Sequence, residues 1–248
     1  ELYKMSANQG YPRAMFCYSN LIEKEDVELS LSYLHQAAQN EYVPALNKLS
    51  YYYENGIHVE KDVDRAFHLT SIAANYQDAP ALCDLGYYYE RGVGCEVNFD
   101  KAFEYYEASA NLGYPRAISN LGFCYEDGMG CQKDEKKAVE LYQKSSDLGY
   151  AIAQCNLAYC YEVGIGVESD YQQAIKYYTL SADQGFPRAQ CNLGYCYEMG
   201  IGVQEDCHKA FELYQKAAQL GNARAYCNMG IFYEYGTAVE LDEKKAVE

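Results

Sequence analysis

The sequence predicts an all-α protein, built as a solenoid of antiparallel helix pairs with a 36-residue repeat. The first observation is a column of alanines spaced by 36 residues: Ala45, Ala81, Ala117, Ala153, Ala189 and Ala225. The second is a column with the same spacing, four residues later: Leu49, Leu85, Leu121, Leu157, Leu193 and Met229. The third is a glycine column: Gly56, Gly92, Gly128, Gly164, Gly200 and Gly236. Three columns in one register indicate one structural unit repeated along the chain.

Each repeat starts with a predicted helix that runs from the leading alanine to a Tyr-Glu pair, as in residues 117–126 (AISNLGFCYE). Its apolar residues recur at i, i+4 and i+8, which is typical of a helix with one buried face. Gly128 follows and suits the left-handed position that ends a helix. A short G-x-G turn then leads to the second helix of the repeat.

The second helix begins after a capping residue, as Asp134 precedes residues 135–148 (EKKAVELYQKSSDL). Gly149 ends that helix. The same capping slot holds Asp62, Asn98, Asp170, Asp206 and Asp242. Small residues interrupt the first helices at Gly86, Gly122, Ala158, Gly194 and Gly230. Glycine there costs up to about 1 kcal/mol against alanine, so we expect close helix contact in compensation.

The domain organisation that follows is a single solenoid over residues 1–248. About seven units start at residues 14, 45, 81, 117, 153, 189 and 225. The first unit is shorter, because a deletion removes its G-x-G turn. The chain opens and stops within second helices, so we expect a piece of a longer solenoid, truncated within a repeat at both ends.

The charge balance excludes some classes of partner. With 20 Lys+Arg against 36 Asp+Glu, the net charge is −16. Such a field repels phosphate backbones and anionic membranes, so we expect no nucleic-acid partner. No apolar run is long enough to insert in a membrane. The expected location is cytoplasmic, with a secreted or lumenal alternative if a signal peptide precedes the sequence.

The repeat resembles the Sel-1-like repeat, a relative of the tetratricopeptide repeat. The residues that carry the resemblance in one unit are Leu193, Gly194, Tyr197, Gly200, Gly202, Val203, Asp206, Lys209 and Ala210. The resemblance implies a right-handed superhelix whose concave face is lined by the first helices. It also implies a non-enzymatic adaptor or scaffold for protein–protein interaction, because members of this family assemble complexes.

Residue types that carry chemistry show no enzyme-like pattern. The 11 cysteines are interpreted as buried thiols in a reducing compartment rather than as a disulfide ladder. No C-x-x-C occurs, so no metal site is predicted, and no cofactor is expected. The four histidines fall at different places in the repeat and are not expected to form one site.

A glutamate column closes the first helices. It consists of Glu54, Glu90, Glu126, Glu162, Glu198 and Glu234. One interpretation is an acidic stripe that binds a basic partner. The other, which we favour, is a structural residue of the repeat that pairs with a neighbouring Lys or Arg.

The predicted binding site lies on the first helices. An asparagine column comprises Asn120, Asn156, Asn192 and Asn228, continued by Asp84 and Lys48. One helical turn later, Tyr52, Tyr88 and Phe232 share its face. We expect a groove in which the amides bind the backbone of an extended peptide and the aromatic residues add apolar contact. The alternative is that each Asn hydrogen-bonds within the solenoid.

The predicted partner is a peptide or protein segment, neutral to basic in charge. One alternative is a regulatory subunit or pathogen effector that binds a folded partner through other faces. A second is a repeat region attached to a catalytic domain outside this sequence. End-to-end self-association through apolar ends near Leu2 and Val247 is a further expectation.

Overall fold

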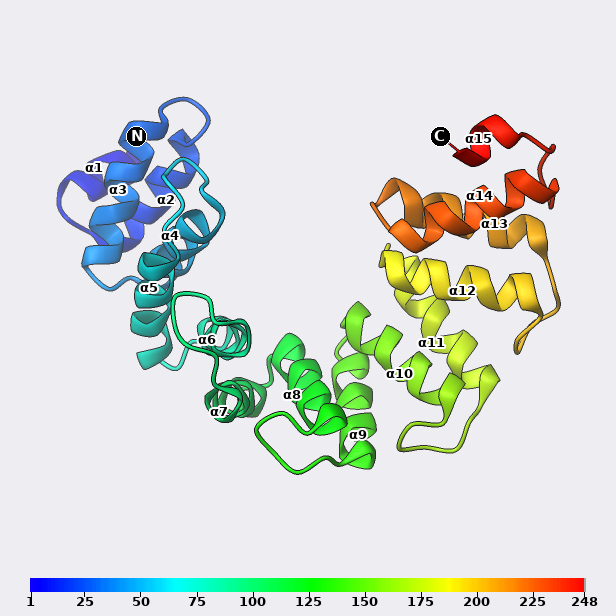
Figure 1. Ribbon diagram of the computed structural model, residues 1–248. Helices are drawn as coiled ribbons and strands as arrows, with labels where there is room; N and C mark the ends of the chain where they lie inside the picture. The colour runs from blue at the N-terminus through cyan, green and yellow to red at the C-terminus, as the bar shows by residue number, and fades with distance from the viewer. Residues whose placement is uncertain (248) are drawn as a thin grey trace. The chain divides into compact units, whose positions relative to one another are not determined.

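The computed structural model describes residues 1–247, and over that range the chain forms fifteen α-helices joined by short loops (Figure 1). The helices are α1 (Leu2–Asn8), α2 (Pro12–Ile22), α3 (Val27–Gln39), α4 (Val43–Asn55), α5 (Val63–Asn75), α6 (Ala79–Arg91), α7 (Phe99–Asn111), α8 (Pro115–Asp127), α9 (Glu135–Asp147), α10 (Ala151–Val163), α11 (Tyr171–Asp183), α12 (Pro187–Met199), α13 (Cys207–Gln219), α14 (Ala223–Tyr235) and α15 (Glu243–Val247). The predicted all-α helical-repeat solenoid is confirmed.

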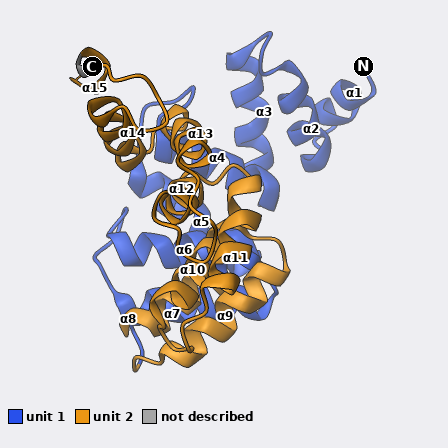
Figure 2. Cartoon of the chain, turned by 90° about the vertical axis from the view of Figure 1, so that its right-hand side faces the viewer, with its two compact units in different colours: residues 1–117, 129–131 blue, residues 118–128, 132–248 orange. Residues whose placement is uncertain are grey.

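The chain folds into two compact units, which Figure 2 colours separately. The N-terminal unit contains residues 1–117 and 129–131. The C-terminal unit contains residues 118–128 and runs from residue 132 to the end of the described chain. Each unit has its own core of buried alanines, leucines and tyrosines. The division falls within α8, and the repeat pattern continues through it.

Helices pack most closely in pairs within each unit. In the N-terminal unit these pairs are α2 with α3, α4 with α5, and α6 with α7. In the C-terminal unit they are α10 with α11 and α12 with α13. Each pair also packs on the next, since α5 contacts α6 and α11 contacts α12. The pairs are therefore stacked repeats, as expected for a helical-hairpin solenoid.

The loop inside each repeat is fixed by the residues that the sequence singled out. Gly164 ends α10 in the left-handed conformation, with φ at 82°. The Asp170 side chain then caps α11 by accepting from backbone N–H groups. The Asp170 N–H donates to the carbonyl of Tyr161, 2.9 Å away, and so ties the cap to the end of α10. The predicted capping role is confirmed at this position and at its equivalents in other repeats.

The mid-helix glycines accommodate a tyrosine ring from the second helix of the same repeat. A Cβ atom added to Gly86 would lie 2.6 Å from Cδ1 and Cε1 of Tyr106, which is within van der Waals overlap. Gly122 faces Tyr142 in the same way, with a closest distance of 2.9 Å. These rings are fully buried, so the expected close helix contact is confirmed, and the residue that packs against each glycine is a tyrosine.

Candidate functional site

The glutamate column is bonded to buried tyrosine hydroxyls. Tyr142 and Tyr178 donate to Glu126 and Glu162, each over 2.6 Å. The equivalent pairs Tyr106–Glu90 and Tyr214–Glu198 are 2.8 and 2.5 Å long. Glu90 also forms the expected pair with a neighbouring cation, since its Oε1 lies 3.0 Å from Arg91 Nε. The bonds agree with the favoured interpretation of the column as structural, but its recurring partner is Tyr rather than Lys or Arg. A buried phenol needs a hydrogen-bond acceptor, and a carboxylate at the helix end supplies one.

The first two repeats supply this hydroxyl from a different helix. Thr70 occupies the place of Tyr106, and Tyr88, on the first helix of the following repeat, donates to Glu54 over 3.0 Å. Likewise Tyr52 donates to Glu23. Where the second helix carries Tyr, the following repeat has Cys or Phe in place of Tyr88, namely Cys124, Cys160, Cys196 and Phe232. Each of these glutamates thus receives a hydroxyl. Cys124, Cys160 and Cys196 leave the ring to the tyrosine of the second helix, whereas Tyr214 packs on the Phe232 ring with centroids 5.8 Å apart.

Burial and the facing carboxylates together make the tyrosines weak acids. Burial, with Glu54 adding to it, raises the pKa of Tyr88 to about 12. The same causes raise the pKa values of Tyr142, Tyr178 and Tyr214 still further. Glu23 shows the opposite effect, because hydrogen bonds from Lys48 and Tyr52 lower its pKa.

The lysine of the repeat packs on tyrosine rather than on the glutamate column. Lys137 Nζ lies 4.1 Å from the ring centroid of Tyr125 and donates to its hydroxyl over 2.6 Å. Lys209 and Tyr197 repeat the arrangement at 4.2 and 2.7 Å. These contacts cover the outer edge of the core with a cation–π interaction.

The asparagine column lies half-buried on the first helices and bonds partly within its own unit. Asn192 Oδ1 accepts from Arg224 over 3.3 Å, while Asn192 Nδ2 donates to the Tyr178 hydroxyl, also over 3.3 Å. Asn156 accepts from Arg188 over 3.5 Å, and Asp84 forms a 2.9 Å ion pair with Arg116. These bonds agree with the alternative that the column is structural, although the Asn156 and Asn192 amides each have hydrogen-bonding capacity beyond these bonds.

Three of the predicted groove residues do not reach the surface. Tyr52, Tyr88 and Phe232 are at most 5% exposed and belong to the core. The prediction that they contact a ligand through apolar surface is therefore wrong. Asn120 and Asn228 are half-buried, as are Asn156, Asn192 and Asp84.

The residue that directly precedes Tyr52, Tyr88 or Phe232 in the sequence is the one that faces outward. Successive helix residues differ in direction by about 100°, so the i+3 and i+4 neighbours of each Asn differ in exposure. The i+3 neighbours Phe123, Tyr159 and Ile231 are exposed and Tyr195 is half-buried, whereas every i+4 neighbour is buried. In the C-terminal unit the residues on this side form what we call the C-terminal first-helix face. It consists of Ile152, Asn156, Tyr159, Val163, Arg188, Asn192, Tyr195, Met199, Arg224, Asn228, Ile231 and Tyr235.

This face is rich in exposed apolar side chains. Val163 and Met199 are more than half exposed, and Tyr235 is 70% exposed. Ile152, Tyr159 and Ile231 are also exposed. Sequence reasoning missed them because it took the i+4 neighbour of each Asn as the outward residue. A tyrosine, phenylalanine or isoleucine at the i+3 position of six consecutive repeats was the signal that could have found them.

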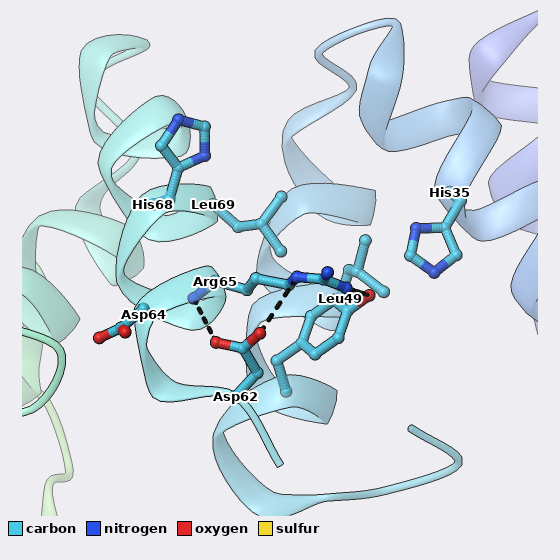
Figure 3. Close-up of a pocket in the computed structure, with 8 residues that line it drawn as sticks. His35, Leu49, Asp62, Asp64, Arg65, His68 and Leu69 are labelled. Carbon is cyan, nitrogen blue, oxygen red and sulfur yellow. Dashed lines mark hydrogen bonds and ion pairs between the residues drawn. The ribbon is translucent and has the colours of Figure 1, made fainter. Parts of the chain in front are cut away.

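A different pocket lies between α3, α4 and α5 in the N-terminal unit (Figure 3). Its volume is about 540 Å³, and its lining includes His35, Leu49, Arg65, His68 and Leu69. Two of the four histidines, His35 and His68, line this pocket from opposite sides.

Two charged groups of this pocket, Arg65 and Asp62, bond each other. Arg65 Nε lies 3.1 Å from Asp62 Oδ2, and Arg65 also donates to the Tyr53 hydroxyl over 3.2 Å. Burial and the Arg65 charge lower the pKa of His35, which favours the neutral imidazole. Figure 3 shows Arg65 and Leu69 between the two imidazole rings, which do not face each other. The arrangement is that of a packed surface hollow.

The cysteines are mostly buried thiols. Cys83, Cys124, Cys155, Cys160, Cys191 and Cys196 are at most 1% exposed, so the interpretation as small buried residues is confirmed there. Cys227 is exposed, contrary to that interpretation. Burial raises the pKa of Cys155 to about 12, which suppresses its thiolate.

Among the side chains that the structure describes, residues 1–242 and 244–247, no group of three or more His, Cys, Asp or Glu is arranged to hold a metal ion. In the same range, every helix is too short or too polar to cross a bilayer.

Comparison with known proteins identifies the family. The sequence model of the Sel1 repeat matches seven consecutive segments: 14–42, 43–75, 79–114, 115–150, 151–186, 187–222 and 223–248. The chain belongs to the Sel1 repeat family. No protein of curated function matches the sequence closely.

Solved structures of similar sequence are Sel1 repeat proteins as well. A Sel1 repeat protein from Oxalobacter formigenes is 28% identical, with a TM-score of 0.85 over 93% of this chain and 95% of the other. Antigen c5321 of uropathogenic Escherichia coli strains, described as a protective antigen with an SLR fold, is 27% identical, with a TM-score of 0.81. The match covers 99% of this chain but 54% of c5321, so the chain spans about half the length of that antigen.

A more distant solved structure shares the fold alone. The immunity protein Pa5087 of Pseudomonas aeruginosa is 21% identical, with a TM-score of 0.58 over 86% of this chain and 83% of the other. The fold by itself does not select a role.

Proposed function

We propose that this Sel1 repeat protein is a non-enzymatic adaptor that binds a peptide or protein segment along its first helices. The observation that supports this proposal is the C-terminal first-helix face. It combines exposed apolar side chains with Asn and Arg side chains that repeat once per helix pair. Contiguous apolar surface rimmed by polar groups is typical of protein interaction sites.

The chemistry of this face suits an extended or helical segment. Tyr159, Ile231 and Tyr235 offer flat and branched apolar surface, which contributes most of the binding energy at interfaces. The asparagines are oriented by Arg188 and Arg224, so their remaining donor and acceptor sites are held in place for a ligand backbone. Because these groups recur with the repeat, they match a ligand that is itself extended.

The charge of the chain restricts the partner. With a net charge of −16, the protein attracts basic segments over long range and repels acidic ones. The proposed partner is therefore a neutral-to-basic polypeptide.

The test is a peptide-display selection on the wild-type protein and on two variants. One is Asn156→Ala/Asn192→Ala, on the proposed face, and the other is Tyr159→Ala/Met199→Ala. The matched control is Lys176→Ala/Glu212→Ala, which changes exposed residues of the second helices α11 and α13.

We expect peptides that bind the wild type and the control but lose at least tenfold in affinity for both face variants. Circular dichroism is used to check that each variant is folded. Peptides that bind all four proteins equally, or bind none of them, contradict the proposal. Loss of binding in the control alone moves the site to the second helices.

A further inference from the structure

A second hollow lies on the first helices of the N-terminal unit, and it is polar. Its volume is about 330 Å³. Ser50, Thr70 and Tyr88 are among its lining residues and are almost fully buried. All of its lining residues fall within the N-terminal unit.

This pocket arises where the repeat loses its tyrosine. Thr70 stands where the four following repeats carry a buried Tyr, and Ser50 stands where three of those repeats carry Gly. Ser50 Oγ lies 2.6 Å from Thr70 Oγ1, so two small hydroxyls occupy the place of a ring packed on glycine. Ser50 and Thr70 are almost fully buried, and both belong to the core beneath the pocket.

The wall of the pocket carries an excess of negative charge. Glu54 and Asp84 contribute two carboxylates, and Arg116 contributes one guanidinium, which pairs with Asp84. Asp78 lies close enough to act on Asp84 as well. The pKa of Asp84 is raised chiefly by burial, Arg116 opposes this, and Glu54 and Asp78 raise it further by like-charge repulsion. One more positive charge in this space would relieve that repulsion.

The rim of the pocket is aromatic. Tyr51 on α4 and Tyr87 on α6 occupy the same place in neighbouring repeats, and both are exposed. Aromatic rings beside carboxylates suit an alkylammonium or guanidinium group, since the ring faces attract the cation and cover its apolar stem. An anionic ligand is repelled by the carboxylates, and a purely apolar ligand gains contact with the rings but no attraction from the carboxylates.

We infer that this pocket receives a lysine or arginine side chain of the polypeptide that the adaptor binds. The stem of that side chain lies between Tyr51 and Tyr87, and its cationic group reaches Glu54 and Asp84. The inference rests on the proposed function for the identity of the ligand. The pocket then selects a basic residue at one position, whereas the C-terminal first-helix face contributes apolar contact.

The direct test uses a small probe, so that it does not depend on a selected peptide. Nα-acetyl-lysine methylamide and its norleucine analogue are titrated into the labelled protein, and amide shifts are followed by NMR. We expect the lysine probe to shift residues around Ser50 and Tyr87 with a dissociation constant in the millimolar range. The norleucine probe, which lacks the charge, should bind at least tenfold more weakly.

Two variants copy other repeats of this chain and should therefore fold. Asp84→Asn introduces the residue found at Asn120, and Ser50→Gly/Thr70→Tyr/Tyr88→Cys introduces the set Gly86, Tyr106 and Cys124. The first removes one carboxylate, and the second refills the space with a ring. We expect the lysine probe to bind at least fivefold more weakly to Asp84→Asn and not at all to the triple variant. Glu162→Gln, in the C-terminal unit, is the matched control and should not change binding.

The outcomes separate this inference from the proposed function. Equal shifts with the lysine and norleucine probes, or unchanged binding by the triple variant, overturn the inference. Display-selected peptides that bind the C-terminal first-helix face but tolerate replacement of every Lys and Arg by norleucine also overturn the inference, while the adaptor role stands. Pocket-dependent binding of the lysine probe in a protein that selects no peptide supports the pocket and contradicts the adaptor role.

Discussion

The hydroxyl of Tyr142 lies 2.6 Å from Oε2 of Glu126, and the ring of the same tyrosine packs on Gly122. One side chain of α9 thereby contacts α8 at two points: its ring occupies the space beside the glycine in the middle of α8, and its hydroxyl bonds a carboxylate in the last turn of α8. The same relation recurs between Tyr178 and Glu162. In the four repeats that carry Tyr106, Tyr142, Tyr178 or Tyr214, this contact adds to apolar burial.

The tyrosine hydroxyl should contribute measurable stability. Tyr142→Phe removes the donor to Glu126 while it keeps the ring, and we expect a loss of about 1–2 kcal/mol in the free energy of unfolding. Urea denaturation measures the change. Tyr159→Phe, which alters an exposed ring, is the control and should cost less than about 0.5 kcal/mol.

The hydroxyl should also be transferable between helices. Tyr142→Thr is expected to destabilise by about 3 kcal/mol or more, because it removes a buried ring. Adding Cys160→Tyr recreates the arrangement of Thr70 and Tyr88, so the double variant should be more stable than Tyr142→Thr alone. If the free-energy losses of the two substitutions simply add, a tyrosine at position 160 does not replace Tyr142 in the core.

Stability should fall steeply at alkaline pH. Tyrosine in an unfolded chain has a pKa near 10, whereas Tyr88 in the folded protein has a pKa of about 12, and Tyr142 and Tyr178 lie higher. Because the folded pKa is raised, the full contribution is present below pH ~10. It is lost as the pH rises toward the folded pKa, since the unfolded chain releases protons first.

Urea denaturation at pH 8, 10 and 11, with tyrosinate absorbance, measures this effect. Each such tyrosine should cost up to about 1.4 kcal/mol per pH unit above pH ~10. Unchanged stability between pH 9 and 11 would contradict the assigned burial of the hydroxyls.

The glycine at position 86 should resist replacement by a better helix former. Gly86→Ala gains up to about 1 kcal/mol in helix propensity, but the new Cβ meets the Tyr106 ring at 2.6 Å. We expect a net loss of about 1–3 kcal/mol, measured by thermal and urea unfolding. A stabilised Gly86→Ala variant would show that the Tyr106 ring moves freely. The natural comparison is the repeat that carries Ala158 in the place of Gly86 and Tyr178 in the place of Tyr106.

Thiol reactivity should divide the cysteines by burial. Cys227 is exposed, whereas Cys155 and Cys160 are buried and have pKa values raised to about 12 by burial. Alkylation of the native protein, followed by peptide mass spectrometry, should modify Cys227 at least tenfold faster than either. Comparable rates would mean that the helix pairs open readily. In urea all of the thiols should react alike.

Local features of this protein were determined by the sequence alone. The 36-residue spacing of Ala153 and Ala189 predicted the repeats, and Asp170 and Gly164 predicted where helices begin and end. These predictions succeeded because caps and left-handed glycines depend on a few neighbouring residues and on their backbone conformation.

Partners and exposure were decided only by the tertiary structure. Tyr87 and Tyr88 are adjacent and chemically identical, yet one is exposed and the other is buried, because a single residue turns the side chain by about 100° around the helix. The partner of Glu54 is likewise a residue of the next repeat. Such contacts depend on how stacked helices are rotated against each other, and a periodic sequence with apolar residues on several sides does not specify that rotation.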